Sequence, residues 1–397
     1  MRFLKHCLPM CIFSLMLHAE EIFIPQPFQD GRVIEQLILI SDVDGVVREG
    51  IEACGDQRVL IAIKSLLENK NIDVTFISGT PVANDSTLEP WRRGNAPLGA
   101  VFGNTFEKEL SENRVAIFGV LGGQKMKEDG SLEIVDAYSS DSCFELGRLL
   151  LHAFLKEVMH QGNLAQQVLA GHLQAKLDAL QMEDYSQPSH ATPKEFAEIV
   201  CTIREHLDPE FRLINSGALV EIHISNPPWK AMRSSLWLQE EIEKPQYGLS
   251  HLPREQKRIA GGYAKKEGEG FNFLLISKTH KGLATKKHIE EKLKKMPNAL
   301  IVTIGDSQVD FPMHHNAHLA FHVGPELVFR DHFVPQCIMV RGKDGRDSQH
   351  VLGTLKVLSL LKEAVGKSFH DFKYIPRQDT SGNWEYYSVK ELEHPEM

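Results

Sequence analysis

The sequence has little cysteine for its length, with six in 397 residues, which is too few for a fold held together by disulfide bonds. It also has no excess of positive charge, because 44 lysines and arginines face 53 aspartates and glutamates and the formal net charge is −9. An acidic surface repels phosphate backbones, so we do not expect a nucleic acid partner. The chain shows no internal repeat and no low-complexity tract. Its 42% hydrophobic and 24% charged residues are typical of a globular protein and exclude disordered, collagen-like and coiled-coil classes.

An apolar run at the N-terminus is too short to span a membrane. Residues 1–19 read MRFLKHCLPMCIFSLMLHA, in which Arg2 and Lys5 precede an apolar stretch from Cys7 to Leu17 and Ala19 stands at a cleavage point. This order is typical of a secretory signal peptide, and a buried N-terminal helix is the alternative. The run is about half of the ~20 residues that a spanning helix needs, so we expect no permanent membrane anchor. The expected location is therefore exported, either periplasmic or secreted.

Export has a consequence for the cysteines. Four of them remain after cleavage, and an exported location permits disulfide bonds between them. Four cysteines allow three connectivities, and the sequence does not choose between them. They are Cys54, Cys143, Cys201 and Cys337.

Apolar runs that end at polar residues mark the expected strands. Such runs are typical of strands that are buried on both faces of a parallel sheet. Helical spacing of apolar residues lies between them, from Val59 to Leu67 and from Gln349 to Leu361. Strands that alternate with helices predict an α/β fold, a Rossmann-like doubly wound parallel sheet built from residues 30–81 and 277–375. The strand runs are Leu37 to Ile40, Asp73 to Ile77, Ala299 to Ile304, Leu319 to Val323 and Cys337 to Val340.

The middle of the chain has a different pattern. Residues 161–180 are rich in Leu, Ala and Gln and predict a helix, whereas residues 218–224 alternate apolar and polar side chains, as a half-exposed antiparallel strand does. Residues 271–276 predict another strand, and the charged, glycine-rich residues 255–270 predict a loop. We therefore expect an inserted α+β cap domain over residues 82–276. Residues 376–397 are expected to form a C-terminal tail.

The first motif with chemistry is Asp42-Val43-Asp44-Gly45, directly after a predicted strand. Ligands of open α/β sheets bind at the carboxyl ends of strands. One carboxylate of such a pair can act as a nucleophile while the other handles protons, and the glycine permits the turn. A calcium-type loop and a solvated turn are the alternatives for this motif on its own.

The second motif, Ser78-Gly79-Thr80, follows the next predicted strand. Its hydroxyl and backbone N–H groups can bind a phosphate oxygen. The alternative is a simple helix cap.

The third and fourth motifs lie after the inserted segment. Lys281-Gly282 opens a predicted helix, where a lysine can neutralise a carboxylate and a phosphate together; a solvated surface lysine is the alternative. Asp306 and Asp310 of the sequence Gly305-Asp306-Ser307-Gln308-Val309-Asp310 provide hard oxygen ligands that suit Mg²⁺. A helix cap is the alternative there. A serine-hydrolase interpretation of Gly-Asp-Ser is discounted, because nothing nearby fits a serine on a strand-to-helix elbow.

In order, type and context these four motifs resemble those of the haloacid dehalogenase (HAD) superfamily of phosphohydrolases. The resemblance covers roughly residues 36–82 and 277–362. The segment between the second and third motifs is similar to the large cap of trehalose-phosphate and sucrose-phosphate phosphatases. Two departures are that Val46-Val47 replaces the usual Thr-containing pair and that Thr80 stands where many relatives carry Arg.

The resemblance implies a role for each motif residue. Asp42 would attack phosphorus and form an aspartyl-phosphate, and Asp44 would protonate the leaving oxygen and then activate water. Mg²⁺ would be held by Asp42, the backbone carbonyl of Asp44, and Asp306. Ser78, Gly79 and Lys281 would bind the phosphoryl group, and Asp310 would position Lys281. An acid at position 44 favours hydrolysis, since ATPases of the family carry threonine there.

The expected activity is therefore that of an Mg²⁺-dependent phosphomonoester hydrolase, with a sugar phosphate or another small phosphate ester as its partner. A phosphomutase on the same fold and a secreted binding or effector protein without turnover are the alternatives. In the cap, Phe102-Gly103-Asn104 is a candidate for a first strand, and Glu221, His223 and Trp229 are candidates for substrate contacts; a structural role is the alternative for each. The oligomeric state is not predicted.

Overall fold

The computed structural model describes most of the chain. The described residues are 33–49, 54–82, 97–180, 194–225, 237–265 except 245, 246 and 248, 270–325, 328, 329, 334, 336–340, 350–368, 377, 378, 384 and 385. The predicted signal peptide 1–19 and Trp229 lie outside them. Within the part that is described, no helix is both long and apolar enough to cross a membrane.

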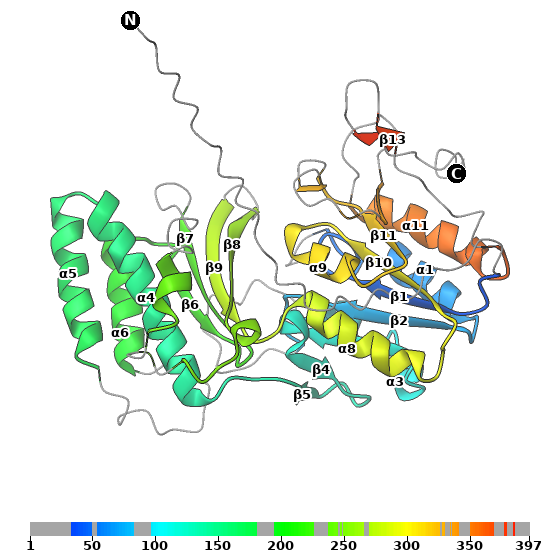
Figure 1. The fold of residues 1–397 in the computed structure, drawn as a ribbon, viewed down its shortest axis with the longest axis horizontal. Coiled ribbons are helices and arrows are strands. Elements are labelled where there is room, and N and C mark those ends of the chain that lie inside the picture. Colours follow the sequence, from blue (N-terminus) through cyan, green and yellow to red (C-terminus); the bar gives the residue numbers. More distant parts are fainter. Residues whose placement is uncertain are drawn as a thin grey trace, which may run out of the picture.

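The molecule has two units, and the larger unit is built on an eight-stranded sheet (Figure 1). Its strand order is β12-β11-β10-β1-β2-β3-β4-β5. The pairs from β12 to β3 are parallel, and β4 and β5 are added antiparallel at one edge. The strands are β1 (Leu37–Ser41), β2 (Ile72–Ile77), β3 (Val115–Gly119), β4 (Gln124–Met126), β5 (Leu132–Ile134), β10 (Leu300–Gly305), β11 (Leu319–His322) and β12 (Cys337–Met339).

Helices cover both faces of this sheet, which confirms the α/β prediction. Alternate residues of β1 point to opposite faces, so Leu37 and Leu39 join one core while Ile38 and Ile40 join the other. The first core is shared with α1 (Gln57–Leu67) and α11 (Val351–Ala364). The second is shared with α8 (Lys281–Leu293) and α9 (Phe311–His314). Burial on both faces explains why the five predicted strand runs are mainly apolar.

A second sheet, of four antiparallel strands, lies apart from the first (Figure 1). Its order is β6-β7-β9-β8, from β6 (Arg212–Asn215), β7 (Leu219–Ser225), β8 (Arg258–Lys265) and β9 (Gly270–Ser277). One face packs on the helices α4 (Ser140–Gln161), α5 (Leu164–Asp178) and α6 (Lys194–His206). The predicted strands 218–224 and 271–276 are thus present, and β9 runs almost directly into α8.

The strand pairing differs from the expected start of the insertion at residue 82. Strand β3 pairs with β2, β4 pairs with β3, and β5 pairs with β4, so residues up to Ile134 complete the larger sheet. Phe102 lies at the end of α2 (Leu98–Phe102) and Gly103 is its C-cap, so the expected first cap strand is wrong there. The chain becomes less apolar after residue 82, which predicted a new domain there. The sheet that a segment joins is set instead by its hydrogen bonds to the neighbouring strand.

One further prediction needs correction. The expected loop 255–270 contains β8, an edge strand whose pairing with β9 outweighs the poor strand propensity of Gly261 and Gly262. The expected helix over 161–180 is present as α5, separated at Gly162 from the longer helix α4.

In the tail, β13 (Arg377–Gln378) and β14 (Trp384–Glu385) form a two-stranded antiparallel pair. Cys54, Cys143, Cys201 and Cys337 are free.

Candidate active site

The motif residues meet at one edge of the larger sheet. Asp42 follows β1, Ser78 follows β2 and Asp306 follows β10, and these three strands are adjacent and parallel. Because the carboxyl ends of parallel strands lie at the same edge, the loops after them form a common site. Strand order therefore joins motifs that stand far apart in the sequence.

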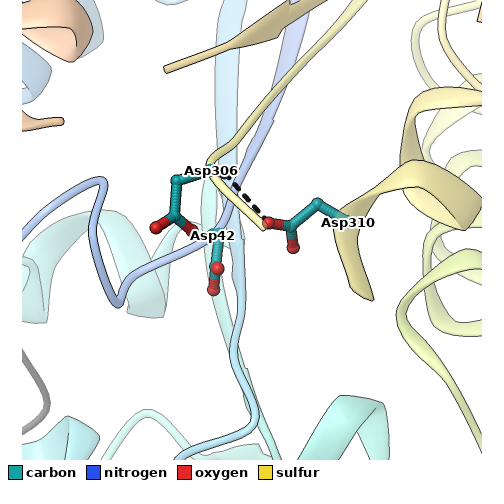
Figure 2. Close-up of side chains that lie close together, drawn as sticks. All are labelled: Asp42, Asp306 and Asp310. Atoms are coloured by element: carbon teal, nitrogen blue, oxygen red, sulfur yellow. Dashed lines mark hydrogen bonds between the residues drawn. The ribbon is translucent and has the colours of Figure 1, made fainter. Parts of the chain in front are cut away.

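Three carboxylates form the centre of the site (Figure 2). Asp42, Asp306 and Asp310 each offer one oxygen atom, and these atoms lie within 4.8 Å of one another. Burial and the nearby Asp310 carboxylate raise the pKa of Asp42 well above its ordinary value, and burial raises the pKa of Asp306. A cluster of buried like charges is a place where an added cation is stabilising.

Lys281, the first residue of α8, supplies one positive charge to this cluster. Its Nζ lies 2.7 Å from Asp42 Oδ1 and 2.6 Å from Asp310 Oδ1, and its side chain is 2% exposed. Burial alone would lower the pKa of Lys281, but the carboxylates of Asp310 and Asp42 raise it above its ordinary value. The lysine is therefore a permanent cation, and the alternative of a solvated surface lysine is wrong.

Asp310 holds the lysine and the loop after β10 together. Its Oδ1 accepts the bond from Lys281, while its Oδ2 accepts from the backbone N–H of Asp306 at 3.0 Å and from the N–H and hydroxyl of Ser307, each at 2.9 Å. Burial would raise the pKa of Asp310, but Lys281 lowers it below its ordinary value. Both oxygens have donors, so the geometry suits positioning of Lys281 more than direct metal binding.

Asp44 bonds residues outside the carboxylate cluster. Its Oδ2 accepts from the hydroxyls of Ser78 at 2.7 Å and Thr80 at 2.9 Å, and its Oδ1 accepts from Arg48 Nε at 2.6 Å. The predicted acid or base and the predicted phosphate-binding serine are thus brought into contact. Gly79 is exposed between the buried residues Ser78 and Thr80, so its backbone is open at the strand end.

The donor set fits a hard divalent cation. Carboxylate oxygens are the ligands that Mg²⁺ prefers. The pKa values of Asp42 and Asp306 are both raised, and a bound cation would lower them again by stabilising the charged carboxylates. The loop after β1 also approaches Asp306 closely: Gly45 has φ +76, and a Cβ there would lie 2.0 Å from Asp306 Oδ2. Glycine at position 45 thus permits both the turn and the contact.

Two residues near this centre were missed by sequence reasoning. Arg48 has no solvent exposure and bonds Asp44; the only signal in the sequence was a charge directly after two valines, Val46 and Val47. His350, at the start of α11, has φ +40 and its Nδ1 lies 3.4 Å from Asp306 Oδ2. Interaction with the Asp306 carboxylate raises the pKa of His350. No motif in the sequence pointed to this histidine.

One face of the smaller sheet contacts the unit that carries the site. Val220, Ile222 and Ile224 of β7 pack on the helices, so Leu219, Glu221 and His223 lie on the other face. On that other face Leu219 packs with Leu121 of the larger unit, and the Leu121 N–H donates to the Ser78 carbonyl at 2.9 Å.

Glu221 and His223 form a pair on this face. Glu221 Oε1 and His223 Nε2 are 3.4 Å apart, and their side chains are 14% and 17% exposed. They lie on the face of the sheet whose Leu219 packs against Leu121 of the larger unit. This position is compatible with the expected substrate contacts.

No family model and no curated protein match the sequence. Solved structures similar to this chain include an IMP-nucleotidase from Plasmodium falciparum with bound IMP, at 11% identity and a TM-score of 0.42, covering 82% of this chain and 68% of that one. A phosphatase of the HAD superfamily from Bacteroides thetaiotaomicron has 12% identity and a TM-score of 0.40, with 82% and 95% covered. The sucrose-phosphatase of Synechocystis, in complex with sucrose and phosphate, has 13% identity and a TM-score of 0.38, with 82% and 99% covered.

Proposed function

We propose that the protein is an Mg²⁺-dependent phosphomonoester hydrolase that works through an aspartyl-phosphate, and that its substrate is a sugar phosphate or another small phosphorylated metabolite. One observation carries this proposal: Lys281 forms a buried ion pair with Asp42, 2.7 Å long, at the end of β1 beside Asp306. A carboxylate fixed next to a permanent cation suits attack on an anionic phosphate, because the cation offsets the repulsion.

In the first step, an Asp42 oxygen attacks phosphorus and the bond to the leaving oxygen breaks. The backbone N–H of Val43 donates to Asp42 Oδ1 at 2.7 Å, so the carboxylate is held in place before the substrate arrives. Lys281 and Ser78 bind the phosphoryl oxygens as charge develops on them. Asp44 gives a proton to the leaving oxygen.

In the second step, Asp44 takes a proton from water, the water oxygen attacks phosphorus, and the bond to Asp42 breaks. Asp310 keeps Lys281 in place through both steps by the 2.6 Å bond between them. Mg²⁺ held by Asp42, Asp306 and the backbone carbonyl of Asp44 would supply positive charge that reduces repulsion between the site and the phosphate.

We propose that the four-stranded sheet selects the substrate. Glu221 and His223, on the face that packs against Leu121, are suited to hydrogen bonds with hydroxyl groups of a leaving group.

We also propose that the chain is exported, on the pattern of residues 1–19, which requires a substrate that occurs outside the cytoplasm. Sequencing the N-terminus of the protein after secretion tests this second point: a start at Glu20 supports cleavage, and a start at Met1 contradicts it.

The test of the activity is phosphate release from a panel of phosphomonoesters, with Mg²⁺ and with EDTA, by the wild type and by Asp42→Asn. Release that needs both Mg²⁺ and Asp42 supports the hydrolase. An isomerised phosphate ester without free phosphate would instead support a phosphomutase on the same residues. Substrate that is bound but unchanged by folded protein would support a binding role without turnover. Equal release by the wild type and Asp42→Asn would contradict the aspartyl-phosphate.

A further inference from the structure

Arg48 is a buried arginine that contacts Asp44, the proposed acid and base. It is fully shielded from solvent, at 0% exposure, and it follows Val46 and Val47, which are equally buried. Its backbone N–H donates to the Val43 carbonyl at 3.1 Å, and its carbonyl accepts from the Gly45 N–H at 2.8 Å. The turn after β1 therefore closes on Arg48 and turns its side chain back to the site.

The guanidinium of Arg48 contacts two residues of the site. Nε and one terminal nitrogen each lie 2.6 Å from Asp44 Oδ1, and the same terminal nitrogen donates to Thr80 Oγ1 at 3.1 Å. Burial of a charged group costs several kcal/mol unless the group is paired and hydrogen-bonded. Arg48 is stabilised in this place by Asp44, and Asp44 in turn is 23% exposed on the side of the site.

The donors divide the two oxygens of Asp44 between them. Oδ1 faces a guanidinium, which cannot accept a proton, while Oδ2 faces the hydroxyls of Ser78 and Thr80, which can rotate and either donate or accept. Oδ1 is therefore held by the arginine, while Oδ2 contacts hydroxyl groups that can exchange a hydrogen bond. The contact of Ser78 with Oδ2 also puts that oxygen beside the expected phosphoryl site.

We propose that Arg48 is a positioning residue that makes Oδ2 the working oxygen of Asp44 in proton transfer; this inference rests on the proposed hydrolase function. In the first step the proton leaves Oδ2 for the leaving oxygen as the bond between that oxygen and phosphorus breaks. In the second step a water proton passes to Oδ2 as the water oxygen bonds to phosphorus. Arg48 has no exposed surface, so it acts through the residues that it contacts, Asp44 among them, and does not touch the substrate.

The inference predicts a dependence on the leaving group. An aryl phosphate such as 4-nitrophenyl phosphate releases a stable anion and needs little help from an acid, whereas an alkyl phosphate such as glycerol phosphate needs a proton. Arg48→Gln is expected to lower kcat for the alkyl ester by at least about tenfold more than for the aryl ester, with little change in KM. Asp44→Asn should show the same selectivity, and Arg48→Lys, which keeps the charge but loses the fork, should fall between wild type and Arg48→Gln.

A matched control separates this effect from general loss of a buried ion pair. Lys292 is 3% exposed and pairs with Asp73 at 2.7 Å, near the start of β2 and so at the opposite end of that strand from the site loops. Lys292→Gln is expected to reduce stability without changing the ratio of alkyl to aryl rates. An equal fall for both esters in Arg48→Gln, or no fall for either, would overturn the inference.

A second measurement decides the point without turnover. A crystal structure of Arg48→Gln is expected to show the Asp44 carboxylate turned, with the bonds from Ser78 and Thr80 to Oδ2 lost. Asp44 in its wild-type orientation would overturn the inference even if the variant were inactive. If the wild type releases no phosphate from any ester, the proposed function fails, and the crystal structure still shows whether Arg48 orients Asp44.

Discussion

Lys281 Nζ lies 2.7 Å from Asp42 Oδ1 in an ion pair that is almost fully buried, although the two residues stand on opposite sides of the inserted segment. The pair ties the first residue of α8 to the end of β1. The ammonium also bonds Asp310, so one cation serves two carboxylates. Loss of this cation would leave both carboxylates buried and uncompensated, which has consequences for stability and for chemistry.

The first prediction concerns Lys281→Met. The substitution should lower the free energy of unfolding by about 3–5 kcal/mol, because it leaves buried charge unpaired, and should lower phosphate release by at least about a hundredfold. Urea unfolding and a phosphate assay measure the two effects. Lys287→Met, an exposed position on the same helix, is the control and should stay within about 0.5 kcal/mol of wild type. Similar results for the two variants would contradict a central role for Lys281.

The second prediction concerns the cation and has a readout other than activity. Mg²⁺ at about 100 times its dissociation constant should raise the free energy of unfolding by roughly 2.7 kcal/mol relative to EDTA. Asp306→Asn should reduce that gain, because it removes one carboxylate of the cluster. Thermal unfolding with and without Mg²⁺ measures both. An identical midpoint for the wild type in Mg²⁺ and in EDTA would argue against a cation at the cluster.

The third prediction concerns pH and His288. Burial lowers the pKa of His288 to about 3, and its Nε2 lies 2.7 Å from Thr75 Oγ1. Its ordinary value is 6.5, so between about pH 3 and 6.5 the unfolded chain binds a proton that the folded protein does not. Stability should therefore fall as the pH drops below about 6.5, by up to about 1.4 kcal/mol per pH unit from this group.

Urea unfolding at pH 7.5 and pH 5.0 tests the role of His288. His288→Leu should have a smaller difference between the two pH values than wild type, whatever its stability at pH 7.5. An unchanged difference would show that His288 is not responsible for the pH dependence.

The fourth prediction concerns substrate selection by the smaller sheet. His223→Ala and Glu221→Gln should raise KM for the preferred phosphate ester by about tenfold, which corresponds to one lost hydrogen bond. Turnover of 4-nitrophenyl phosphate should change little, because the reacting residues are untouched. His206→Ala is the control, since that side chain is 58% exposed at the end of α6. A loss of equal size for both esters would indicate a structural role for the pair.

The predictable part of the fold is the part buried on two faces. β1 is an apolar run up to Ser41 because helices cover both of its faces, and such a run is visible in a single sequence. β8 was predicted as a loop because Gly261 and Gly262 favour flexibility, and its pairing with β9 is a tertiary contact that local sequence does not report. α4 is buried over much of its surface, so its apolar residues lack the one-sided period that marks a helix.

For the site, spacing and context indicated Asp42, Asp44, Ser78, Lys281, Asp306 and Asp310, and the structure brings them to one edge of the sheet. Their roles stay predictions. Arg48 could not be assigned from sequence because an arginine between Val47 and Glu49 is as compatible with a solvated turn as with a buried ion pair. Only the closure of the turn, through Gly45 and Val43, shows that its side chain faces Asp44.

The position of β1 between β2 and β10 also sets the order in which the molecule can be completed during synthesis. β2 emerges soon after β1, but Leu37 pairs on its other side with Leu300, about 260 residues later. At about 5–20 residues per second, a ribosome leaves that edge of β1 open for roughly 10 to 50 s. An open edge can pair with another chain, so nascent chains are most exposed to aggregation in this interval. Asp42 is made early, but it meets Lys281 and Asp306 only when the last third of the protein arrives.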